Sequence, residues 1–558
     1  MITEKLTLPD LLNRSCALYP NNLSLNFVTQ GDRTYRQLHR EVNALARHLA
    51  GLGVTKGDKV AILSASMPNW AIAQFAIATI GAIAVPVLPG FSPAEVKNIL
   101  EHAEVKVLFV SRLLVKTLEG LDLPLLKHKI LANTLATIPD GKYSPEEMDA
   151  LAPDVDMTND APMPPAPVNE KDVASIIYTS GTTGFSKGVV LTHENLTWNA
   201  RQSHTIQPVG PRDRFLSILP MAHAFENTLG LILPLMYGSS VYYLDRVPTP
   251  RLLVPAMQKV RPTVMLSVPL VIEKIYKTQI APALRASALT RLLCRTRAGR
   301  KLLHRAAGRK LARTFGGQLE FFGIGGAKLD ATVERFLREA RFPYSIGYGL
   351  TETSPLIAGA NPSHTFFQGV GPAMEGVSMK IDQPDERGEG EILVKGRGVM
   401  QGYYRQPKLN AETFTPDGWF RTGDLGSIDE RGRLTIRGRI KTMILGSSGE
   451  NIYPEEIESI INHFRFVDES LVVEKSGRLV AMVHLNMEEL EKHYRHFKNQ
   501  AENYKSLAGD YLEELQQEIR DYVNARVSNF SRLQLVLVQH EPFEKTPSMK
   551  IKRFLYNK

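Results

Sequence analysis

Short apolar runs alternate with amphipathic helical patterns through the first 350 residues of this chain. The runs, each short enough for a buried strand, lie at 59–65, 106–111, 174–180, 213–220, 239–245 and 262–269. This alternation predicts α/β layers with largely parallel sheets, because parallel strands need a helical connection between them. After Gly347, short strands separated by glycines indicate antiparallel β-structure.

A chain of 558 residues is too long for one hydrophobic core, so we expect two or more domains. A Pro- and Asp-rich stretch at 134–170 is typical of a surface connector. A smaller region begins near residue 440 and contains charged helices at 486–527 and a basic tail.

The cysteine content bears on the compartment. Cys16 and Cys294 are the only cysteines, and they lie far apart in the sequence. This argues against a disulfide framework or a structural zinc site and favours a reducing compartment. Residues 1–10 lack the apolar core of a signal peptide. We therefore expect a cytoplasmic protein.

The segment Trp70–Leu88 is almost wholly apolar and approaches the roughly 20 residues of a membrane-spanning helix. Gln74 interrupts the segment, and Pro86 breaks helical hydrogen bonding near its end. The segment therefore predicts a buried helix at about 70–80 followed by a buried strand at 82–88.

The net charge of +9 is concentrated in one stretch, because no acidic residue lies between Glu273 and Glu320. Twelve basic residues lie there: Lys274, Lys277, Arg285, Arg291, Arg295, Arg297, Arg300, Lys301, Arg305, Arg309, Lys310 and Arg313. The rest of the chain is therefore slightly acidic.

Helical periodicity within this stretch separates an apolar face from a basic one. The apolar face consists of Leu303, Ala307 and Leu311, and the basic face of Arg297, Lys301, Arg305 and Arg309. Three interpretations stay open: a helix on an anionic bilayer, a core-facing helix with a solvated basic side, and a nucleic-acid patch. We expect peripheral membrane contact through 274–313, at the inner face of the membrane, or a solvated face, rather than a nucleic-acid partner.

A loop rich in hydrogen-bond donors follows the apolar run at 174–180 and reads YTSGTTGFSKG. Its donors are the hydroxyl and backbone N–H groups of Thr179, Ser180, Gly181, Thr182, Thr183 and Gly184, and Lys187 adds a positive charge. A bound polyphosphate is the simplest explanation, with a flexible turn as the alternative. The P-loop template does not fit, because Gly188 follows the lysine.

The stretch YTSGTTGFSKGVVLTHENL resembles the phosphate-binding signature of the adenylate-forming superfamily, which contains acyl-CoA synthetases, peptide-synthetase adenylation domains and firefly-type luciferases. Further motifs of that superfamily follow in order, from LGVTKGDKVAIL near the start to TPSMKIKR at the end. Ser186 stands where the signature usually has Pro. The resemblance implies a large N-terminal domain (1–438) of layered α/β subdomains with a β-barrel-like subdomain. A small, mobile α+β C-terminal lid domain (439–558) would follow.

The motif GYGLTETSP resembles the central motif of the superfamily. The resemblance implies that Tyr348 stacks on the adenine of ATP and that Gly349 belongs to the same binding segment. It also implies that Thr351 binds the α-phosphate and that Glu352 holds Mg²⁺. A hard dication prefers an oxygen ligand of this type.

Two further motifs imply contacts to the nucleoside. GIGGAKL resembles the glycine segment that lines the adenine pocket, which assigns Gly325 and Gly326 to it. GWFRTGDLG places Asp424 where the superfamily binds the ribose hydroxyls. A carboxylate with two acceptor oxygens suits that task.

The last third of the chain resembles the hinge and the mobile lid of the superfamily. GRIKTMILGSSGENIYPEEIE implies that Arg439 contacts ribose or phosphate and that Lys441 lies at the hinge, beside Thr442 where an acidic residue is common. Lys550 aligns with the C-terminal catalytic lysine, although Met549 replaces the usual glycine. Lys552 is a nearby competitor for that role.

The implied reaction has two halves. A carboxylate attacks the α-phosphorus of ATP to give an acyl-adenylate and pyrophosphate, and a thiol then attacks the adenylate. The small domain swings between the halves and opens a pantetheine tunnel near Gly446–Gly449. No covalent enzyme intermediate is required.

The segment LPMAHAFENT resembles the PLAHxxE form of long-chain fatty acyl-CoA synthetases. His223 and Phe225 would lie near the entrance to the acyl pocket, with Glu226 in the variable place. The leading hypothesis is therefore a fatty acid–CoA ligase that uses ATP, Mg²⁺ and CoA. Two alternatives stay open: adenylate formation with loading onto a separate acyl carrier protein, and a non-catalytic membrane-surface binding protein of the same fold.

Overall fold

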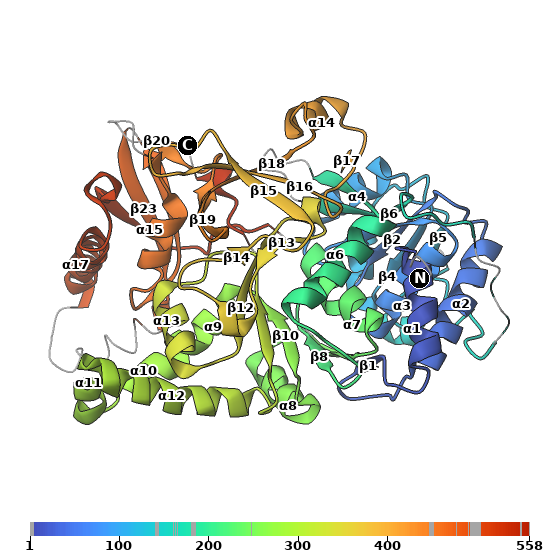
Figure 1. The fold of residues 1–558 in the computed structure, drawn as a ribbon, viewed down its shortest axis with the longest axis horizontal. Helices are drawn as coiled ribbons and strands as arrows, with labels where there is room; N and C mark the ends of the chain where they lie inside the picture. Colours follow the sequence, from blue (N-terminus) through green and yellow to red (C-terminus); the bar gives the residue numbers. More distant parts are fainter. Residues whose placement is uncertain are drawn as a thin grey trace. The chain divides into compact units, whose positions relative to one another are not determined.

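The computed structural model describes residues 5–139, 144–159, 161, 163, 166–179, 186–246, 248–445, 451–475, 477–488, 490, 504–546 and 550–556. The chain divides into two compact units, whose elements are labelled in Figure 1. The first unit consists of Met1–Lys380, Leu393–Arg421 and Ile428–Thr435, and the second of Ile381–Ile392, Thr422–Ser427 and Ile436–Lys558. The domain boundary after residue 438 remains a prediction.

The first unit contains a seven-stranded sheet in the order β17-β7-β6-β3-β2-β4-β5. Its strands are β2 (Lys59–Leu63), β3 (Ile83–Val87), β4 (Val107–Val110), β5 (His128–Leu131), β6 (Val173–Thr179), β7 (Lys187–Thr192) and β17 (Gly402–Tyr403). Strands β2 to β6 are parallel, β7 is antiparallel to β6, and β17 is antiparallel to β7. The predicted parallel α/β layering is confirmed.

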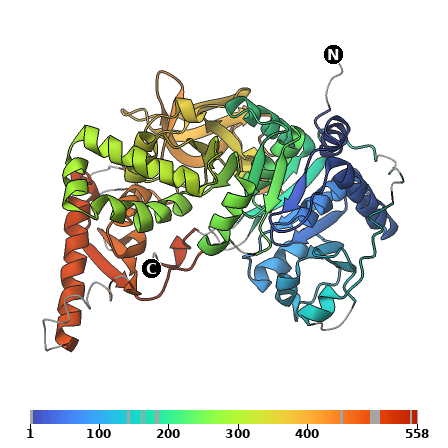
Figure 2. The same cartoon turned by 90° about the horizontal axis from the view of Figure 1, so that it is seen from below.

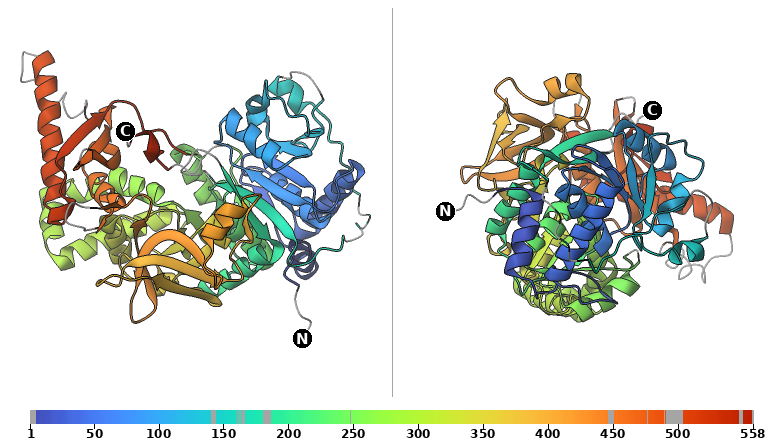
Figure 3. Two further views of the ribbon diagram at one scale, coloured as in Figure 1. Left: turned by 90° about the horizontal axis from the view of Figure 1, so that it is seen from above. Right: turned by 90° about the vertical axis from the view of Figure 1, so that its right-hand side faces the viewer.

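Five helices accompany this sheet: α1 (Leu8–Leu18), α2 (Tyr35–Gly51), α3 (Pro68–Thr79), α4 (Pro93–His102) and α6 (His193–Ile206). Helices α1, α2 and α3 pack against one another, and α3 also contacts β2 and β3 (Figure 3). Four of the five begin at a Ser or Thr whose hydroxyl accepts a backbone N–H bond. Such caps define where a helix starts.

The apolar segment at 70–88 forms the predicted helix and strand. In α3 every residue from Trp70 to Ala78 is buried, and β3 is almost wholly buried beside it. Gln74 is tolerated inside the core because its amide exchanges two hydrogen bonds with Asn227, at 3.2 and 2.6 Å. Among the described helices, none is both long and apolar enough to cross a membrane.

A second seven-stranded sheet in the first unit has the order β1-β9-β8-β10-β11-β12-β13. Its strands are β1 (Leu25–Phe27), β8 (Arg214–Ser217), β9 (Ser240–Tyr243), β10 (Val264–Ser267), β11 (Phe321–Ile324), β12 (Tyr344–Gly349) and β13 (Leu356–Gly359). The first six are parallel, and β13 is antiparallel to β12. The helices of this part include α8 (Pro250–Val260), α9 (Pro269–Ile275) and α13 (Ala331–Ala340).

The basic stretch forms three helices, α10 (Ala281–Arg285), α11 (Ala288–Arg295) and α12 (Arg297–Thr314), coloured yellow-green in Figure 2. The predicted apolar face of α12 packs inward: Leu311 is buried, and Leu303 and Ala307 are half-buried. The prediction that the face of Leu303, Ala307 and Leu311 packs against the protein core is therefore confirmed. This face, which the sequence allowed to bind a bilayer, instead packs against the core of the first unit.

The region after Gly347 supplies a five-stranded sheet in the order β14-β19-β18-β16-β15. Its strands are β14 (Gly371–Pro372), β15 (Val377–Asp382), β16 (Gly390–Gly396), β18 (Phe420–Ile428) and β19 (Arg433–Arg439). The pairing of β14 with β19 is antiparallel, as the sequence predicted for this region.

The second unit contains a small α+β core, as expected for the C-terminal part. It has a two-stranded sheet, β20 (Ile444–Leu445) with β21 (Asn451–Ile452), and a three-stranded sheet, β22 (Val467–Lys475), β23 (Arg478–Leu485) and β24 (Leu535–Gln539). Helices α15 (Pro454–Ile461) and α17 (Tyr504–Asn524) pack apolar side chains against these strands. The mobility of this unit remains a prediction.

Short helical segments complete the structure: η1 (Arg112–Leu118), α5 (Pro145–Asp149), η2 (Glu226–Ile232), α7 (Leu233–Met236), η3 (Tyr276–Ile280), η4 (Thr351–Thr353), η5 (Pro362–His364), α14 (Pro407–Thr413), η6 (Asn529–Ser531) and η7 (Arg553–Leu555). The η2 and η3 segments are π-helical. Insertions of this kind are frequent at functional positions.

Candidate functional site

The predicted phosphate loop follows one strand of an antiparallel pair, β6, and precedes the other, β7. Strand β6 ends at Thr179 and β7 begins at Lys187, and these two residues are paired directly across the hairpin. The structure therefore brings the first donor of the loop and its lysine together. The remaining predicted donors, Ser180, Gly181, Thr182, Thr183 and Gly184, lie outside the described residues.

Lys187 and Glu352, which are 165 positions apart, meet around one tyrosine that the sequence reasoning missed. The ammonium Nζ of Lys187 lies 5.1 Å from the ring centre of Tyr403. The Tyr403 hydroxyl donates a 2.9 Å hydrogen bond to Oε1 of Glu352. A cation over an aromatic face is attracted by the ring, and the phenol holds the carboxylate through a charge-assisted bond. The predicted phosphate and magnesium residues thus form one cluster with Tyr403.

Strand pairing explains how Tyr403 reaches this cluster. In β17, Tyr403 pairs with Val189 of β7, two residues beyond Lys187. The preceding Gly402 has φ of +141°, and a Cβ there would meet the Asn410 side chain at 2.9 Å. Only glycine suits such a backbone. The backbone N–H of Met400 also donates to the Glu352 carbonyl, at 2.8 Å, which ties the two segments together.

The motif around Glu352 is a strand followed by a tight turn. Tyr348 and Gly349 end β12, and Thr351 and Glu352 form η4. A Cβ at Gly349 would lie 1.9 Å from the Pro355 carbonyl oxygen, so no other residue fits there. The four predicted residues of this motif therefore lie in one segment at the end of β12.

The acyl-side segment and the glycine segment also meet. The backbone N–H of Phe225 donates to Nδ1 of His223 at 3.3 Å, which leaves the proton of a neutral ring on Nε2. A Cβ at Gly325 would contact the Phe225 ring at 3.3 Å. Gly326 has φ of +90°, a conformation that favours glycine. His223, Phe225, Gly325 and Gly326 therefore surround one region of the first unit.

Glu226, one residue beyond Phe225, is a buried carboxyl with only 2% of its surface exposed. Its Oε1 accepts a 2.5 Å hydrogen bond from the Ser217 hydroxyl, and its Oε2 has no partner among the described residues. Burial raises the pKa of Glu226 to about 8. Its carboxyl group lies over Gly230, where a Cβ would approach Oε1 to 2.5 Å. Burial therefore favours the protonated, neutral form of Glu226.

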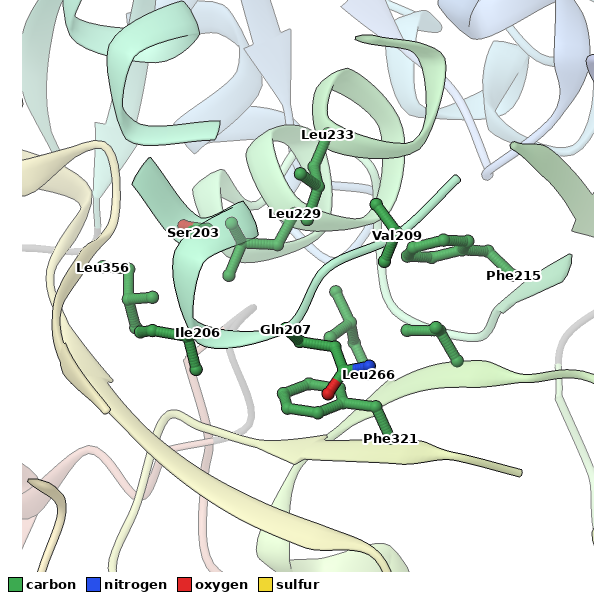
Figure 4. Close-up of a pocket in the computed structure, with 11 residues that line it drawn as sticks. Ser203, Ile206, Gln207, Val209, Phe215, Leu229, Leu233, Leu266, Phe321 and Leu356 are labelled. Atoms are coloured by element: carbon green, nitrogen blue, oxygen red, sulfur yellow. The ribbon is translucent and has the colours of Figure 1, made fainter. Parts of the chain in front are cut away.

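An apolar cavity of about 40 Å³ lies next to this pair. Side chains from α6, β8, η2, α7, β10 and β13 line it, among them Ile206, Phe215, Leu229, Leu233, Leu266 and Leu356 (Figure 4). Phe215 is two residues before Ser217 on β8, so both side chains point to the same face of the sheet. The Ser217–Glu226 pair therefore stands beside the cavity, toward the carboxyl end of the strand.

The second unit contains the predicted ribose residues. Arg439 Nε lies 3.0 Å from Oδ1 of Asp424, which has only 4% of its surface exposed. Adjacent strands β18 and β19 bring these two residues together. Lys441 follows in an exposed turn, and Thr442 donates from its hydroxyl to Oε1 of Glu455 at 2.7 Å. At the position predicted to lie beside the hinge, the threonine therefore hydrogen-bonds a carboxylate.

The two candidate lysines of the tail differ in their surroundings. Lys550 is exposed, and its backbone N–H and carbonyl bond to Thr546, at 3.2 and 2.7 Å. The Nζ of Lys552 lies 3.8 Å from Oε2 of Glu544. The intervening residues 547–549, with Met549, lie outside the described residues, as do residues 446–450, near which the pantetheine tunnel is predicted.

Residues 12–404 match the sequence model of a family described as AMP-binding enzyme. The chain is an AMP-binding enzyme. The resemblance to the adenylate-forming superfamily is therefore confirmed.

Two sequence relatives illustrate the similarity of this AMP-binding enzyme to known proteins. The long-chain-fatty-acid–CoA ligase FadD15 of Mycobacterium bovis is 31% identical over 556 residues, covering 94% of this chain and 90% of that protein. A feruloyl-CoA synthase of Amycolatopsis sp is 29% identical over 452 residues, covering 79% of this chain and 80% of that protein. The resemblance to long-chain fatty acyl-CoA synthetases is confirmed.

Two solved structures show the same fold. ATP-bound MatB from Rhodopseudomonas palustris has a TM-score of 0.75 and 22% identity, covering 99% of this chain and 98% of that one. The o-succinylbenzoate CoA synthetase MenE of Bacillus subtilis, in complex with its acyl-adenylate intermediate, has a TM-score of 0.74 and 23% identity, covering 98% of each chain. The predicted fold class is confirmed.

Proposed function

We propose that this AMP-binding enzyme is a fatty acid–CoA ligase. A carboxylate oxygen of the fatty acid attacks the α-phosphorus of ATP, which forms an acyl-adenylate and releases pyrophosphate. The CoA thiol then loses its proton and attacks the acyl carbonyl, and AMP leaves with the former carboxylate oxygen. The relative named long-chain-fatty-acid–CoA ligase, similar over nearly the whole chain, supports this reaction.

The observation that carries this proposal is the cluster of Lys187, Tyr403 and Glu352. A cation and a carboxylate on one tyrosine suit a polyphosphate, since the cation attracts phosphate oxygens and the carboxylate binds a phosphate-bound metal. Thr179 faces Lys187 across the hairpin and would add a hydroxyl donor. The predicted donors Ser180 to Gly184 would complete the binding of the leaving pyrophosphate.

The motifs assign nucleoside contacts to residues within each unit. In the first unit, Tyr348 would stack on adenine, Gly325 and Gly326 would allow close backbone approach, and Thr351 would bind the α-phosphate. In the second unit, Asp424 would accept hydrogen bonds from the ribose hydroxyls. Arg439, whose Nε lies 3.0 Å from Oδ1 of Asp424, would contact the ribose or a phosphate and also orient that carboxylate.

Magnesium is part of the proposal, with Glu352 as its protein ligand. The Tyr403 hydroxyl donates to Oε1 of Glu352, and Oε2 accepts no hydrogen bond from the described side chains. Oε2 would therefore be the oxygen that binds Mg²⁺, which prefers oxygen ligands. No group of three or more His, Cys, Asp or Glu side chains within the described part of the chain could hold a metal ion. Such an ion would neutralise charge on the phosphates and take most of its ligands from them and from water.

Lys550 would stabilise the negative charge that develops on the α-phosphate during adenylate formation. The Glu544 carboxylate beside Lys552 makes that lysine the weaker candidate. Lys441 would act as the hinge about which the small domain swings between the two half-reactions.

The acyl chain would extend from His223 and Phe225 toward the apolar cavity. The cavity is lined mainly by aliphatic and aromatic side chains, with Ser203 and Gln207 as its polar members, and such a lining suits a hydrocarbon. His223 would lie beside the reacting carboxylate. A long-chain fatty acid is the substrate class that these features favour.

The thiol acceptor is CoA in this proposal, with loading onto a separate acyl carrier protein as the alternative. We also propose a cytoplasmic enzyme with peripheral contact to the inner face of a membrane. The buried Cys16 and half-buried Cys294, neither in a disulfide, support a reducing compartment.

The test is AMP release from purified protein with palmitate, ATP and Mg²⁺, with and without CoA. AMP that accumulates over many turnovers only when CoA is present supports the ligase. Palmitate-dependent exchange of pyrophosphate into ATP, with no gain in turnover from CoA, supports the carrier-protein alternative. The absence of both activities across a panel of fatty acids supports a non-catalytic binding protein.

A further inference from the structure

Helices α11 and α12 expose three leucines that the sequence pattern did not single out. Leu289 and Leu292 on α11 expose 66% and 60% of their surface, and Leu302 on α12 exposes 60%. Leu289 and Leu292 are three residues apart, so they share one helical face. None of the residues of α11 is buried. The apolar face of an amphipathic helix is normally buried against the core, so an uncovered one indicates a surface that binds a partner or a membrane.

The contacts of α12 fix which of its faces points outward. Gly308 packs closely on Ala340 of α13, since a Cβ on that glycine would approach Ala340 Cβ to 2.6 Å. On the same side, Arg300 pairs with Glu339 of α13 at 2.8 Å. Leu302 therefore cannot turn inward without breaking these contacts.

Cationic side chains surround the exposed leucines. On α12, Arg305, Arg309 and Arg313 are exposed and share the face of Leu302, at spacings of three, seven and eleven residues. On α11, Arg291 and Arg295 are also exposed. Because the chain from Lys274 to Leu319 has no carboxylate, no residue of this stretch neutralises the surface.

We infer that the outer faces of α11 and α12 dock on an anionic phospholipid bilayer. Leu289, Leu292 and Leu302 enter the headgroup region, while the arginines bind lipid phosphates. A helix that combines an apolar face with cationic flanks binds in the plane of a membrane surface. The leucines favour lipid over nucleic acid, because a phosphate backbone gains nothing from exposed aliphatic side chains.

This inference gives the proposed function a source of substrate, since long-chain fatty acids partition into bilayers. The inference rests on the proposed function only in assigning the bilayer as the source of the fatty acid. Vesicle binding is measured without substrate, so it succeeds or fails independently of ligase activity.

The experiment is co-sedimentation of the full chain with vesicles of phosphatidylcholine, alone or with 30 mol% phosphatidylglycerol. We expect binding to the anionic vesicles and little to the neutral ones. The double substitution Leu289→Ser and Leu292→Ser should weaken the partition coefficient about tenfold, and Arg305→Gln with Arg309→Gln should weaken it by a similar factor. The activity of these variants on palmitate in detergent solution should stay within about twofold of the wild type. The substituted side chains are exposed, and none of them belongs to the proposed catalytic or binding residues.

The matched controls are Leu113→Ser, which changes a leucine with 73% exposure in η1, and the pair Lys116→Gln and Lys127→Gln. These should leave vesicle binding unchanged. The inference is overturned if the wild type ignores anionic vesicles, or if the α11 leucine variant binds them as the wild type does. Tighter binding to a DNA duplex that depends on Arg305 and Arg309 but not on the leucines would assign the surface to nucleic acid instead.

Discussion

The hydroxyl of Tyr403 donates a 2.9 Å hydrogen bond to Oε1 of Glu352, and the same tyrosine ring lies 5.1 Å from Nζ of Lys187. One residue thus holds the two side chains proposed to bind magnesium and phosphate. The substitution Tyr403→Phe keeps the ring and removes only the hydroxyl. We expect it to raise the magnesium concentration needed for half-maximal activity about tenfold, because a hydrogen bond to a charged group is worth roughly 1.5 kcal/mol or more.

The control for Tyr403 is its neighbour Tyr404, whose ring contacts Lys59 and the edge of His102 rather than Glu352. Tyr404→Phe should leave the magnesium dependence unchanged. Equal shifts in both variants would show that the Tyr403 hydroxyl has no specific effect on Glu352.

The buried Glu226 should make stability depend on pH. Its ordinary pKa is 4.5, and burial raises it to about 8 in the folded protein. Between these values the unfolded chain loses a proton that the folded chain keeps, so the free energy of unfolding falls as pH rises through this window. The thermal midpoint should therefore fall more steeply between pH 5 and pH 8 in the wild type than in Glu226→Gln.

The glutamine in that variant still accepts the hydrogen bond from Ser217 but does not titrate. Ser217→Ala removes the bond and keeps the titrating carboxyl, so it should lower the midpoint while retaining the pH slope. Parallel slopes in the wild type and in Glu226→Gln would contradict a proton held on this carboxyl.

Asp424 should distinguish nucleotides by their ribose hydroxyls. The wild type is expected to use ATP better than 2′-deoxy-ATP by about tenfold in kcat/KM, because an unpaired acceptor is left in the buried site. Asp424→Ala should lower kcat/KM for ATP and remove most of this discrimination. The exposed Asp429, paired with Arg433, is a matched control.

If Asp424→Ala lowered the use of both nucleotides by the same factor, the carboxylate would not be a ribose ligand. Asp429→Ala should leave the preference for ATP intact.

Lys550 should matter for only one half of the reaction. Lys550→Ala is expected to slow adenylate formation about 10³-fold, because it removes a cation from the developing charge. Thioester formation from supplied palmitoyl-adenylate and CoA should stay near the wild-type rate. Lys552 pairs with Glu544, so Lys552→Ala should leave the rates of both half-reactions nearly unchanged. Equal loss of both half-reactions in Lys550→Ala would contradict its proposed role.

Hydrophobic patterning predicted the parts of the fold that depend on burial alone. The helix and strand at 70–88 and the inward face of Leu311 follow from it. Burial of apolar side chains is favourable whatever path the rest of the chain takes. The motifs likewise predicted Lys187 and Glu352. Their meeting around Tyr403 did not follow from local pattern, because it depends on β17 pairing with β7 across more than 200 residues.

The exposed leucines of α11 show what periodicity alone does not predict, namely whether an apolar helical face is covered. Leu289 and Leu292 form an apolar helical face that periodicity alone would turn inward. Only the packing of the neighbouring helix α12 on α13 reveals that the adjoining surface stays uncovered. The sequence signal that pointed to this part of the site was the GYYR segment at 402–405, which begins with a glycine and contains Tyr403.

The central claim is that the fatty acid oxygen bonds to the α-phosphorus of ATP before the CoA thiol attacks the acyl carbonyl. Palmitate labelled with ¹⁸O in its carboxyl group tests this directly, by mass spectrometry of the nucleotide and phosphate products. The account predicts one ¹⁸O atom in AMP and none in pyrophosphate. Label in inorganic phosphate beside unlabelled ADP, the signature of an acyl phosphate, would contradict it.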